Sequence, residues 1–321
     1  MIYEYAMDPE CLGTFNSFWQ ALSQFGVHHG RVLCECPTKW LKDVKKAIYD
    51  ATGDDDYECA MLIERLKELE DSDWFVRRAS EKLDQSKDSW FEKILPEHQR
   101  MPFRGVICNG PKAANGELVL TKYDLRDENP NWYVDPTPQV ARTAGDIARA
   151  FAPLGRRAAD LLIIDPYFGQ KPHDFLSIPA IISSSHCNES PLKRIEIHTV
   201  FEPGKPNSKS VTEIEKSITH ALKVEFCNLL PKDLPQLSVT IWERSVAGDA
   251  FHDRYLLTNI GGVGITVGLD VGKQDERLNE DTTIFRLGPE LFLLRKSQFD
   301  RHSVEHKRLA KKYKWVKDVV V

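Results

Sequence analysis

The chain has 321 residues, of which 41% are hydrophobic and 28% charged, with a formal net charge of -5 at pH 7. This length predicts two domains, and the charge excludes a global attraction to nucleic acid or anionic membranes, so such a partner would need a local patch. The first residues, MIYEYAMDPE, have neither the basic nor the apolar region typical of a signal peptide, and no stretch reaches roughly 18 apolar residues. The seven cysteines are irregularly spaced. We therefore expect a cytoplasmic protein with reduced thiols.

The first 130 residues are predicted to form a mainly helical α+β domain. Residues 9–25, 38–51 and 57–70 carry apolar side chains at helical spacing. The segments 30–36, 103–108 and 117–123 have the composition of short strands. The role of this domain is left unassigned, with recruitment of a protein partner as one alternative.

The segment RDENPNWYVDPTPQ, residues 126–139, interrupts this pattern. Its three prolines and several Asp and Asn residues can continue neither a helix nor a central strand. We place a domain boundary near 128–139, which gives domains of residues 1–130 and 140–321.

Helical and strand patterns alternate beyond this boundary. Helices are predicted at 141–154, 172–184 and 211–224, and strands at 159–165, 194–200, 237–242, 251–259, 262–268 and 282–288. Helical patterns then run from 289 to the end. Strands that alternate with helices, followed by a run of strands, indicate an α/β domain with a mixed sheet between helices.

The predicted strand FHDRYLLTN, residues 251–259, begins with titratable side chains. Because alternate residues of a strand share a face, His252 and Arg254 are expected to point the same way. Asn259 follows seven residues after His252, which gives the pattern His-x-Arg-x4-Asn. This pattern resembles the His-x-Lys-x4-Asp motif of the phospholipase D superfamily.

The resemblance extends to other strands of this domain. The segments LLIIDPYF, RIEIHTV, FHDRYLLTN and GITVGLD follow one another. Their order is similar to that in the phospholipase D-like C-terminal domain of proteins with a microtubule-interacting-and-trafficking domain. The resemblance covers about residues 140–321 and implies a single lobe of the phospholipase D fold.

The resemblance also implies a reaction, in which a neutral imidazole attacks phosphorus and a second imidazole protonates the leaving oxygen. No metal or other cofactor is implied. His252 would be the nucleophile and Arg254 would bind the phosphate, while Asn259 replaces the motif's carboxylate and Glu280 matches a carboxylate that orients the histidine. Because one lobe supplies one such histidine, a homodimer is expected. The expected activity is that of a nuclease.

Four further residues are expected to line the substrate site. Asp165 and Tyr167 end a predicted strand, where ligand crevices form in such sheets. Thr266 can supply a hydroxyl, whereas Asp270 brings a negative charge near the phosphate. Arginine in place of lysine at 254 keeps phosphate binding but changes its geometry. These departures leave open an inactive phosphate-binding module for nucleic acid or anionic membrane lipid.

The C-terminal segment 295–317 is strongly basic. It carries nine Lys and Arg residues, among them Lys311 and Lys312, against Asp300 and Glu305. Cations interleaved with aromatic residues suit a polyanion, either nucleic acid or a phosphoinositide membrane. We therefore expect Lys311 and Lys312 to contact the substrate.

Two patterns resemble sets of zinc ligands. HSVEH, residues 302–306, matches the pattern of inverted zinc peptidases but lacks a third ligand. His28, His29, Cys34 and Cys36 lie close in sequence, yet a Cys-x-Cys pair on a strand is typical of buried small side chains. We expect a solvated helix in the first case and core thiols in the second.

Overall fold

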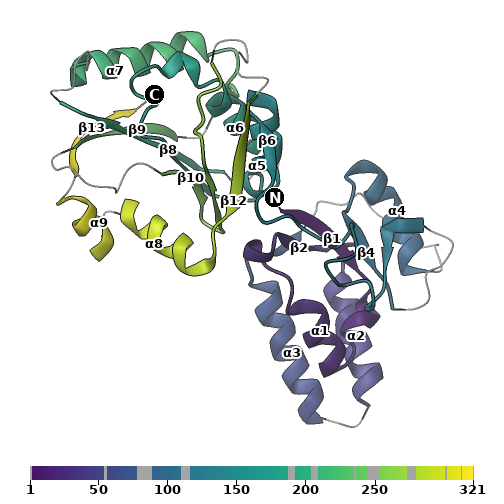
Figure 1. The fold of residues 1–321 in the computed structure, drawn as a ribbon. Helices are drawn as coiled ribbons and strands as arrows, with labels where there is room; N and C mark the ends of the chain where they lie inside the picture. Colours follow the sequence, from purple (N-terminus) through teal and green to yellow (C-terminus); the bar gives the residue numbers. More distant parts are fainter. Residues whose placement is uncertain are drawn as a thin grey trace. The chain divides into compact units, whose positions relative to one another are not determined.

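The computed structural model describes residues 2–53, 56–77, 89–109, 116–186, 192–203, 209–234, 236–244, 253–272, 280–300, 302–311 and 313–320 (Figure 1). The chain divides into two compact units, Ile2–Asp135 and Pro136–Val321. By sequence, the first unit carries 17 Lys and Arg against 25 Asp and Glu, and the second carries 26 against 23. The excess of positive charge is therefore confined to the second unit, which the net charge of the whole chain conceals.

The first unit is built on a five-stranded parallel sheet with strand order β3-β2-β1-β4-β5. Its strands are β1 (Tyr3–Met7), β2 (Arg31–Glu35), β3 (Phe75–Arg77), β4 (Gly105–Ile107) and β5 (Val119–Leu120). Parallel strands joined through helices make this an α/β unit, which corrects the expected mainly helical α+β domain. The strands expected at 30–36, 103–108 and 117–123 contain β2, β4 and β5, whereas β1 and β3 were not predicted. β3 has only three residues, too few for a period of two to be recognised.

Four helices belong to this unit: α1 (Phe15–Leu22), α2 (Trp40–Thr52), α3 (Asp56–Glu70) and α4 (Trp90–Arg100). Short 3-10 turns occur at η1 (Pro9–Leu12), η2 (Val27–His29) and η3 (Gly116–Leu118). The helix expected over 9–25 is divided, because Thr14 forms a capping box with Ser17 and starts α1 there. Trp132, from the proline-rich segment, is fully buried and contacts Tyr5 edge-on, so this segment contributes to the core.

The second unit contains an eight-stranded mixed sheet in the order β13-β9-β8-β7-β10-β11-β12-β6. Its strands are β6 (Gln139–Ala141), β7 (Asp160–Ile164), β8 (Arg194–Phe201), β9 (Gln236–Arg244), β10 (Arg254–Thr258), β11 (Gly262–Ile265), β12 (Asp281–Arg286) and β13 (Tyr313–Val320). Strands β7, β8 and β9 are parallel, and β10 runs antiparallel to β7. The predicted mixed sheet is thus confirmed, with β7 as a buried inner strand.

Helices cover both faces of this sheet (Figure 1). They are α5 (Ala144–Gly155), α6 (Ser177–Ser185), α7 (Val211–His220), α8 (Pro289–Phe299) and α9 (Val304–Leu309), with a 3-10 turn η4 (Pro172–Asp174) and a π-helical turn η5 (Ala221–Glu225). Phe299 and Leu309 of α8 and α9 pack on Leu162, Tyr255 and Leu257 of the sheet. No helix in the described part of the chain is long and apolar enough to cross a membrane.

The C-terminal segment departs from its prediction. Helical patterns were expected from 289 to the end, but residues 313–320 form the edge strand β13, antiparallel to β9. The sequence YKWVKDVV is rich in aromatic and β-branched residues, which favour a strand once a neighbouring strand is available. The helical prediction for this segment was therefore wrong.

Candidate functional site

Strand pairing brings the Asp165–Tyr167 loop and Arg254 together. Tyr255 of β10 is paired with Ile164, the last residue of β7. Because the two strands are antiparallel, the start of β10 lies beside the end of β7. The predicted nucleophile His252 lies outside the described residues, so the described part of the motif begins at Asp253.

A cleft of about 350 Å³ opens at this end of the two strands. Its lining residues come from the loop after β7, the start of β10, the loop after β11 and the start of the unit: Arg142, Tyr167, Gln170, Lys171, Asp174, Phe175, Arg254, Val267 and Asp270. Three of the residues predicted from sequence, Tyr167, Arg254 and Asp270, therefore share one cleft.

Arg254 is held in place while keeping donors available. Its guanidinium carbon lies 5.0 Å from the centroid of the Tyr167 ring, and Nη1 donates to the Thr266 carbonyl oxygen at 3.3 Å. Its buried Nε has no hydrogen-bond partner among the described residues. Gly268 has a φ of +106°, and a Cβ there would lie 3.0 Å from this Nε, so only glycine lets the loop approach so closely. Arg254 is thus positioned to receive an anion.

Thr266 contributes its backbone to the site. Its carbonyl oxygen accepts from Arg254, while its hydroxyl accepts from the backbone N–H of Thr283 at 3.1 Å. The hydroxyl predicted to contact substrate is therefore engaged with β12. Thr266 helps to orient Arg254.

Asp165 is buried beneath the cleft, with 1% of its surface exposed. One carboxylate oxygen accepts from the Tyr167 amide at 2.9 Å and the other from the Leu269 amide at 3.2 Å. Burial raises the pKa of Asp165 to about 6, although these amides and the charge of Arg254 oppose the shift. The carboxylate joins the two loops that line the cleft, so its position indicates loop organisation rather than direct contact with a ligand.

Arg142 is a site residue that the sequence did not reveal. It is 1% exposed, and its guanidinium forms an ion pair with the Glu280 carboxylate and a second with Asp270, at 3.0 Å. The negative charge that Asp270 brings to the cleft is therefore offset by a buried cation. The Glu280 carboxylate, expected to orient His252, has Arg142 as one partner, and His252 lies outside the described residues. A lone arginine before a helix carries no pattern from which this could have been predicted.

Asn259 is not brought to the cleft. It follows the other end of β10 from Arg254, and its side-chain oxygen accepts from the amides of Ala159 and Asp160 at 2.7 and 3.3 Å. These bonds cap the start of β7. The placement corrects the expectation that Asn259 joins the catalytic group, since a five-residue separation along a strand is roughly 16 Å.

Asp253 and Tyr255 fix the start of β10 on the opposite face. The Tyr255 hydroxyl donates to the Asp253 carboxylate at 2.7 Å, and Arg295 of α8 pairs with the same carboxylate at 3.1 Å. The Arg295 guanidinium also lies 5.1 Å from the centre of the Tyr255 ring. This contact with α8 holds the backbone on either side of Arg254, and the motif did not predict it.

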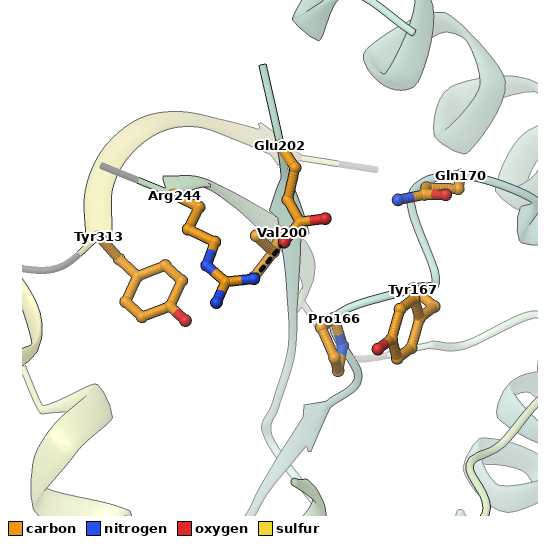
Figure 2. A pocket seen from close by; sticks show the side chains of 7 residues that line it. All are labelled: Pro166, Tyr167, Gln170, Val200, Glu202, Arg244 and Tyr313. Atoms are coloured by element: carbon orange, nitrogen blue, oxygen red, sulfur yellow. Dashed lines mark hydrogen bonds and ion pairs between the residues drawn. The ribbon is translucent and has the colours of Figure 1, made fainter. Parts of the chain in front are cut away.

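A second, smaller cavity of about 20 Å³ adjoins the Asp165–Tyr167 loop, with room for roughly one water molecule. Figure 2 shows Tyr313, Arg244 and Glu202 on one side and Pro166, Tyr167 and Gln170 on the other. Arg244 donates to the Glu202 carboxylate at 2.5 Å. Tyr167 and Gln170 line both cavities, so the Tyr167 loop stands between them.

The basic C-terminal segment does not form one continuous helical face. Its residues are divided among α8, α9 and β13. Several of its cations have carboxylate partners, as in the pairs Arg308–Glu305 and Lys317–Glu215. Lys311 is exposed, whereas Lys312 lies outside the described residues. The local positive surface is therefore smaller than the residue count suggests.

The two candidate sets of zinc ligands are not assembled. Within the described ranges, no group of three or more His, Cys, Asp or Glu side chains could hold a metal ion. His302 precedes α9, and the His306 ring bonds to the carbonyl oxygen of Gln298 at 3.0 Å. Cys34 and Cys36 are buried in an apolar cluster with Ile94 and Phe103. Their surroundings are those of core thiols.

No protein-family model matches the chain, and no curated protein is similar to it in sequence. One solved structure, that of the archaeal chromatin protein TrmBL2, described as showing a novel mode of DNA binding, covers 82% of this chain and 80% of its own. The two are 12% identical, with a TM-score of 0.24. A score this low does not establish a shared fold, so the function is inferred from the site itself.

Proposed function

We propose that the second unit is a phospholipase D-like phosphodiesterase that cleaves nucleic acid without a metal, through a phosphohistidine intermediate in a homodimer. The observation that carries this proposal is the position of Arg254. Its guanidinium enters the cleft beside the Asp165–Tyr167 loop, while Tyr255 points to α8. The proposal adds to this position the sequence-based expectation that His252 shares a face with Arg254.

The proposed reaction has two steps. A neutral His252 nitrogen attacks phosphorus, so that an N–P bond forms as the bond to the leaving oxygen breaks, and a protonated His252 from the second copy of the chain donates a proton to that oxygen. The second imidazole then removes a proton from water, and the water oxygen displaces the first imidazole. A phosphomonoester is released, and Arg254 stabilises the charge on the nonbridging oxygens in both steps.

An inactive phosphate-binding module is the alternative, and one observation favours it. Asp270 places a carboxylate at the cleft that Arg254 enters, next to the expected phosphate position. Binding through Arg254 needs no oriented imidazole. Both functions therefore share the phosphate contact and differ only in turnover.

The test is incubation of the purified protein with labelled DNA and RNA in EDTA. Cleavage is expected to persist with wild type, to be lost in His252→Ala and to be unchanged in His302→Ala, which replaces an exposed histidine far along the sequence from the motif. A phosphohistidine trapped at His252 would support the covalent route, and light scattering should show a dimer. Equal cleavage by wild type and His252→Ala would overturn the proposal. Binding without cleavage, lost in Arg254→Ala, would establish the inactive module.

A further inference from the structure

We infer that the cleft receives one nucleotide unit of a single-stranded nucleic acid, in preference to a duplex or a lipid head group. The inference rests on the proposed contact between Arg254 and phosphate. It depends on three kinds of surface in the same cleft, which match the phosphate, the plane of a base and the edge of a base.

The cationic surface consists of Arg254 and Lys171. Arg254 is fixed by the Tyr167 ring and the Thr266 carbonyl oxygen, and Lys171 is an exposed side chain on the facing loop. The third cation of the cleft, Arg142, already pairs with two carboxylates. A single phosphodiester group would therefore bind at Arg254 and Lys171.

The apolar surface consists of Tyr167 and Val267. Both line the cleft, yet they are 41% and 44% exposed. A tyrosine beside a phosphate-binding arginine provides a platform on which an unpaired base can stack, as in proteins that bind single strands. Arg254 over the Tyr167 ring fixes the orientation of this platform. An anion site for free phosphate would gain nothing from it.

The hydrogen-bonding surface consists of Gln170 and Asp174, on the loop after Tyr167. Lys209 donates to the Gln170 carbonyl oxygen at 2.6 Å, and the amides of Val271 and Gly272 donate to that of Asp174. These backbone bonds hold the loop while the amide and carboxylate side chains line the cleft. Such groups bind the edges of an unpaired base.

The size of the cleft and its surroundings select among polyanions. A volume of about 350 Å³ lies at the small end of the range for ligand sites, in which a single nucleotide fits. Duplex bases are stacked and paired inside the helix and cannot reach Tyr167 unless they are flipped out. A lipid would need an apolar path for its chains, but the neighbouring cavity behind Tyr167 contains the Arg244–Glu202 ion pair (Figure 2).

The test measures binding by the full chain in EDTA with the His252→Ala background, so that no probe is cleaved. The probes are a ten-nucleotide single strand, its duplex, and vesicles containing phosphatidylserine, with inorganic phosphate as competitor. The single strand is expected to bind at least about tenfold more tightly than the duplex. Tyr167→Ala should weaken single-strand binding by about tenfold or more, since stacking on an aromatic ring contributes much of such affinity. Inorganic phosphate should still compete in this variant, with a smaller loss of affinity, because Arg254 keeps its bond to the Thr266 carbonyl oxygen.

Two variants control this experiment. Tyr167→Phe keeps the ring and should retain single-strand affinity, and Tyr123→Ala removes an exposed tyrosine of the first unit and should have no effect. Three results would each overturn the stacking inference. The protein could bind the duplex as tightly as the single strand, or it could bind vesicles more tightly than either. Inorganic phosphate could also fail to displace the single strand from Tyr167→Ala. If inorganic phosphate displaces the single strand from Arg254→Ala as well as from wild type, the proposed phosphate site at Arg254 is wrong. This result is distinct from those that overturn base stacking on Tyr167.

Discussion

The Arg142 guanidinium holds Asp270 by two contacts, with Nη2 3.0 Å from the carboxylate and 2.7 Å from the backbone carbonyl oxygen. Residue 142 follows β6 at the beginning of the second unit, whereas Asp270 lies in the loop after β11. The contact closes one wall of the cleft and neutralises a carboxylate that would otherwise repel phosphate. Residues 128 positions apart thus determine the charge of the site.

Replacement of Arg142 should destabilise the second unit. In Arg142→Gln the carboxylates of Asp270 and Glu280 lose their charged hydrogen-bond donor, and the loss of a hydrogen bond between charged groups costs about 2 kcal/mol. Arg149→Ala is the matched control, because the Arg149–Asp146 pair is exposed and should contribute less than about 0.5 kcal/mol. Calorimetric unfolding measures both. A similar small effect for the two variants would contradict a structural role for Arg142.

Asp165 should make stability depend on pH in an unusual direction. Its pKa is raised by burial from 3.8 to about 6, so the folded protein binds this proton more tightly than the unfolded chain does. The contribution of this proton to the free energy of unfolding is complete below pH 3.8, the pKa of Asp165 in the unfolded chain. This contribution, roughly 3 kcal/mol, is lost as the pH rises through about 6. In Asp165→Asn this component should disappear. The measurement is the free energy of unfolding of wild type and of Asp165→Asn between pH 4 and 7. A difference between the two proteins that stays constant over this range would contradict the titration of Asp165.

Tyr255→Phe should weaken the attachment of β10 to α8. The variant removes the hydroxyl that donates to Asp253 at 2.7 Å and keeps the ring beside Arg295. One lost hydrogen bond costs about 1 kcal/mol. Because burial raises the pKa of Tyr255 to about 12, its phenolate should also be missing from an alkaline absorbance titration below that pH. Tyr123→Phe, at an exposed site, should leave stability unchanged.

Arg254→Lys separates the two proposed functions. Lysine is the residue of the phospholipase D motif that the sequence resembles, but it binds phosphate as a point charge without the fork of an arginine. Phosphate affinity should fall several-fold, while turnover stays within about tenfold of wild type if the second unit is an enzyme. Arg254→Ala should lose both. Tight phosphate binding in wild type without turnover in any variant would indicate the inactive module.

The C-terminal cations should govern the salt dependence of binding. Charge removal at the exposed Lys311 and Lys314 should reduce the slope of log affinity against log salt by about 0.7 for each cation that contacts a single strand. Lys317→Gln is the control, because the Lys317 ammonium pairs with Glu215 at 2.6 Å. A fluorescence titration at four salt concentrations measures the slopes. Equal slopes in all variants would exclude this surface from the nucleic-acid path.

Local patterns were sufficient for β7 to β12 of the second unit, but not for its edge strands β6 and β13. The segments 159–165, 194–200 and 237–242 became β7, β8 and β9. β7 carries a continuous apolar run, as expected of a strand buried on both faces, whereas β8 and β9 begin with alternating polar and apolar residues. The strands β1, β3 and β6 were missed. β3 and β6 are only three residues long, and β1 contains a glutamate between its tyrosines. Pro96 interrupts the helical pattern of α4, which was missed for that reason.

The candidate site was predictable only where the residues belong to one motif or one strand end. Arg254 and Tyr167 were found in this way, since a strand has a fixed period and parallel strands end at one edge. Asn259 was assigned by its spacing, but the strand carries it away from the cleft. Arg142 and Arg295 had no such signal, because each contacts a carboxylate far away in sequence.

The sequence by itself determined the strands β7 to β12, the helical segments around them and the residues that share a face at the start of β10, because these depend on interactions between near neighbours. The tertiary structure decided the strand order, the pairing of β13 with β9 and the partners of the buried charges. Ion pairs and strand neighbours are selected by the three-dimensional packing of the whole unit. A buried charge such as Arg142 is stable only where folding brings its carboxylates to it.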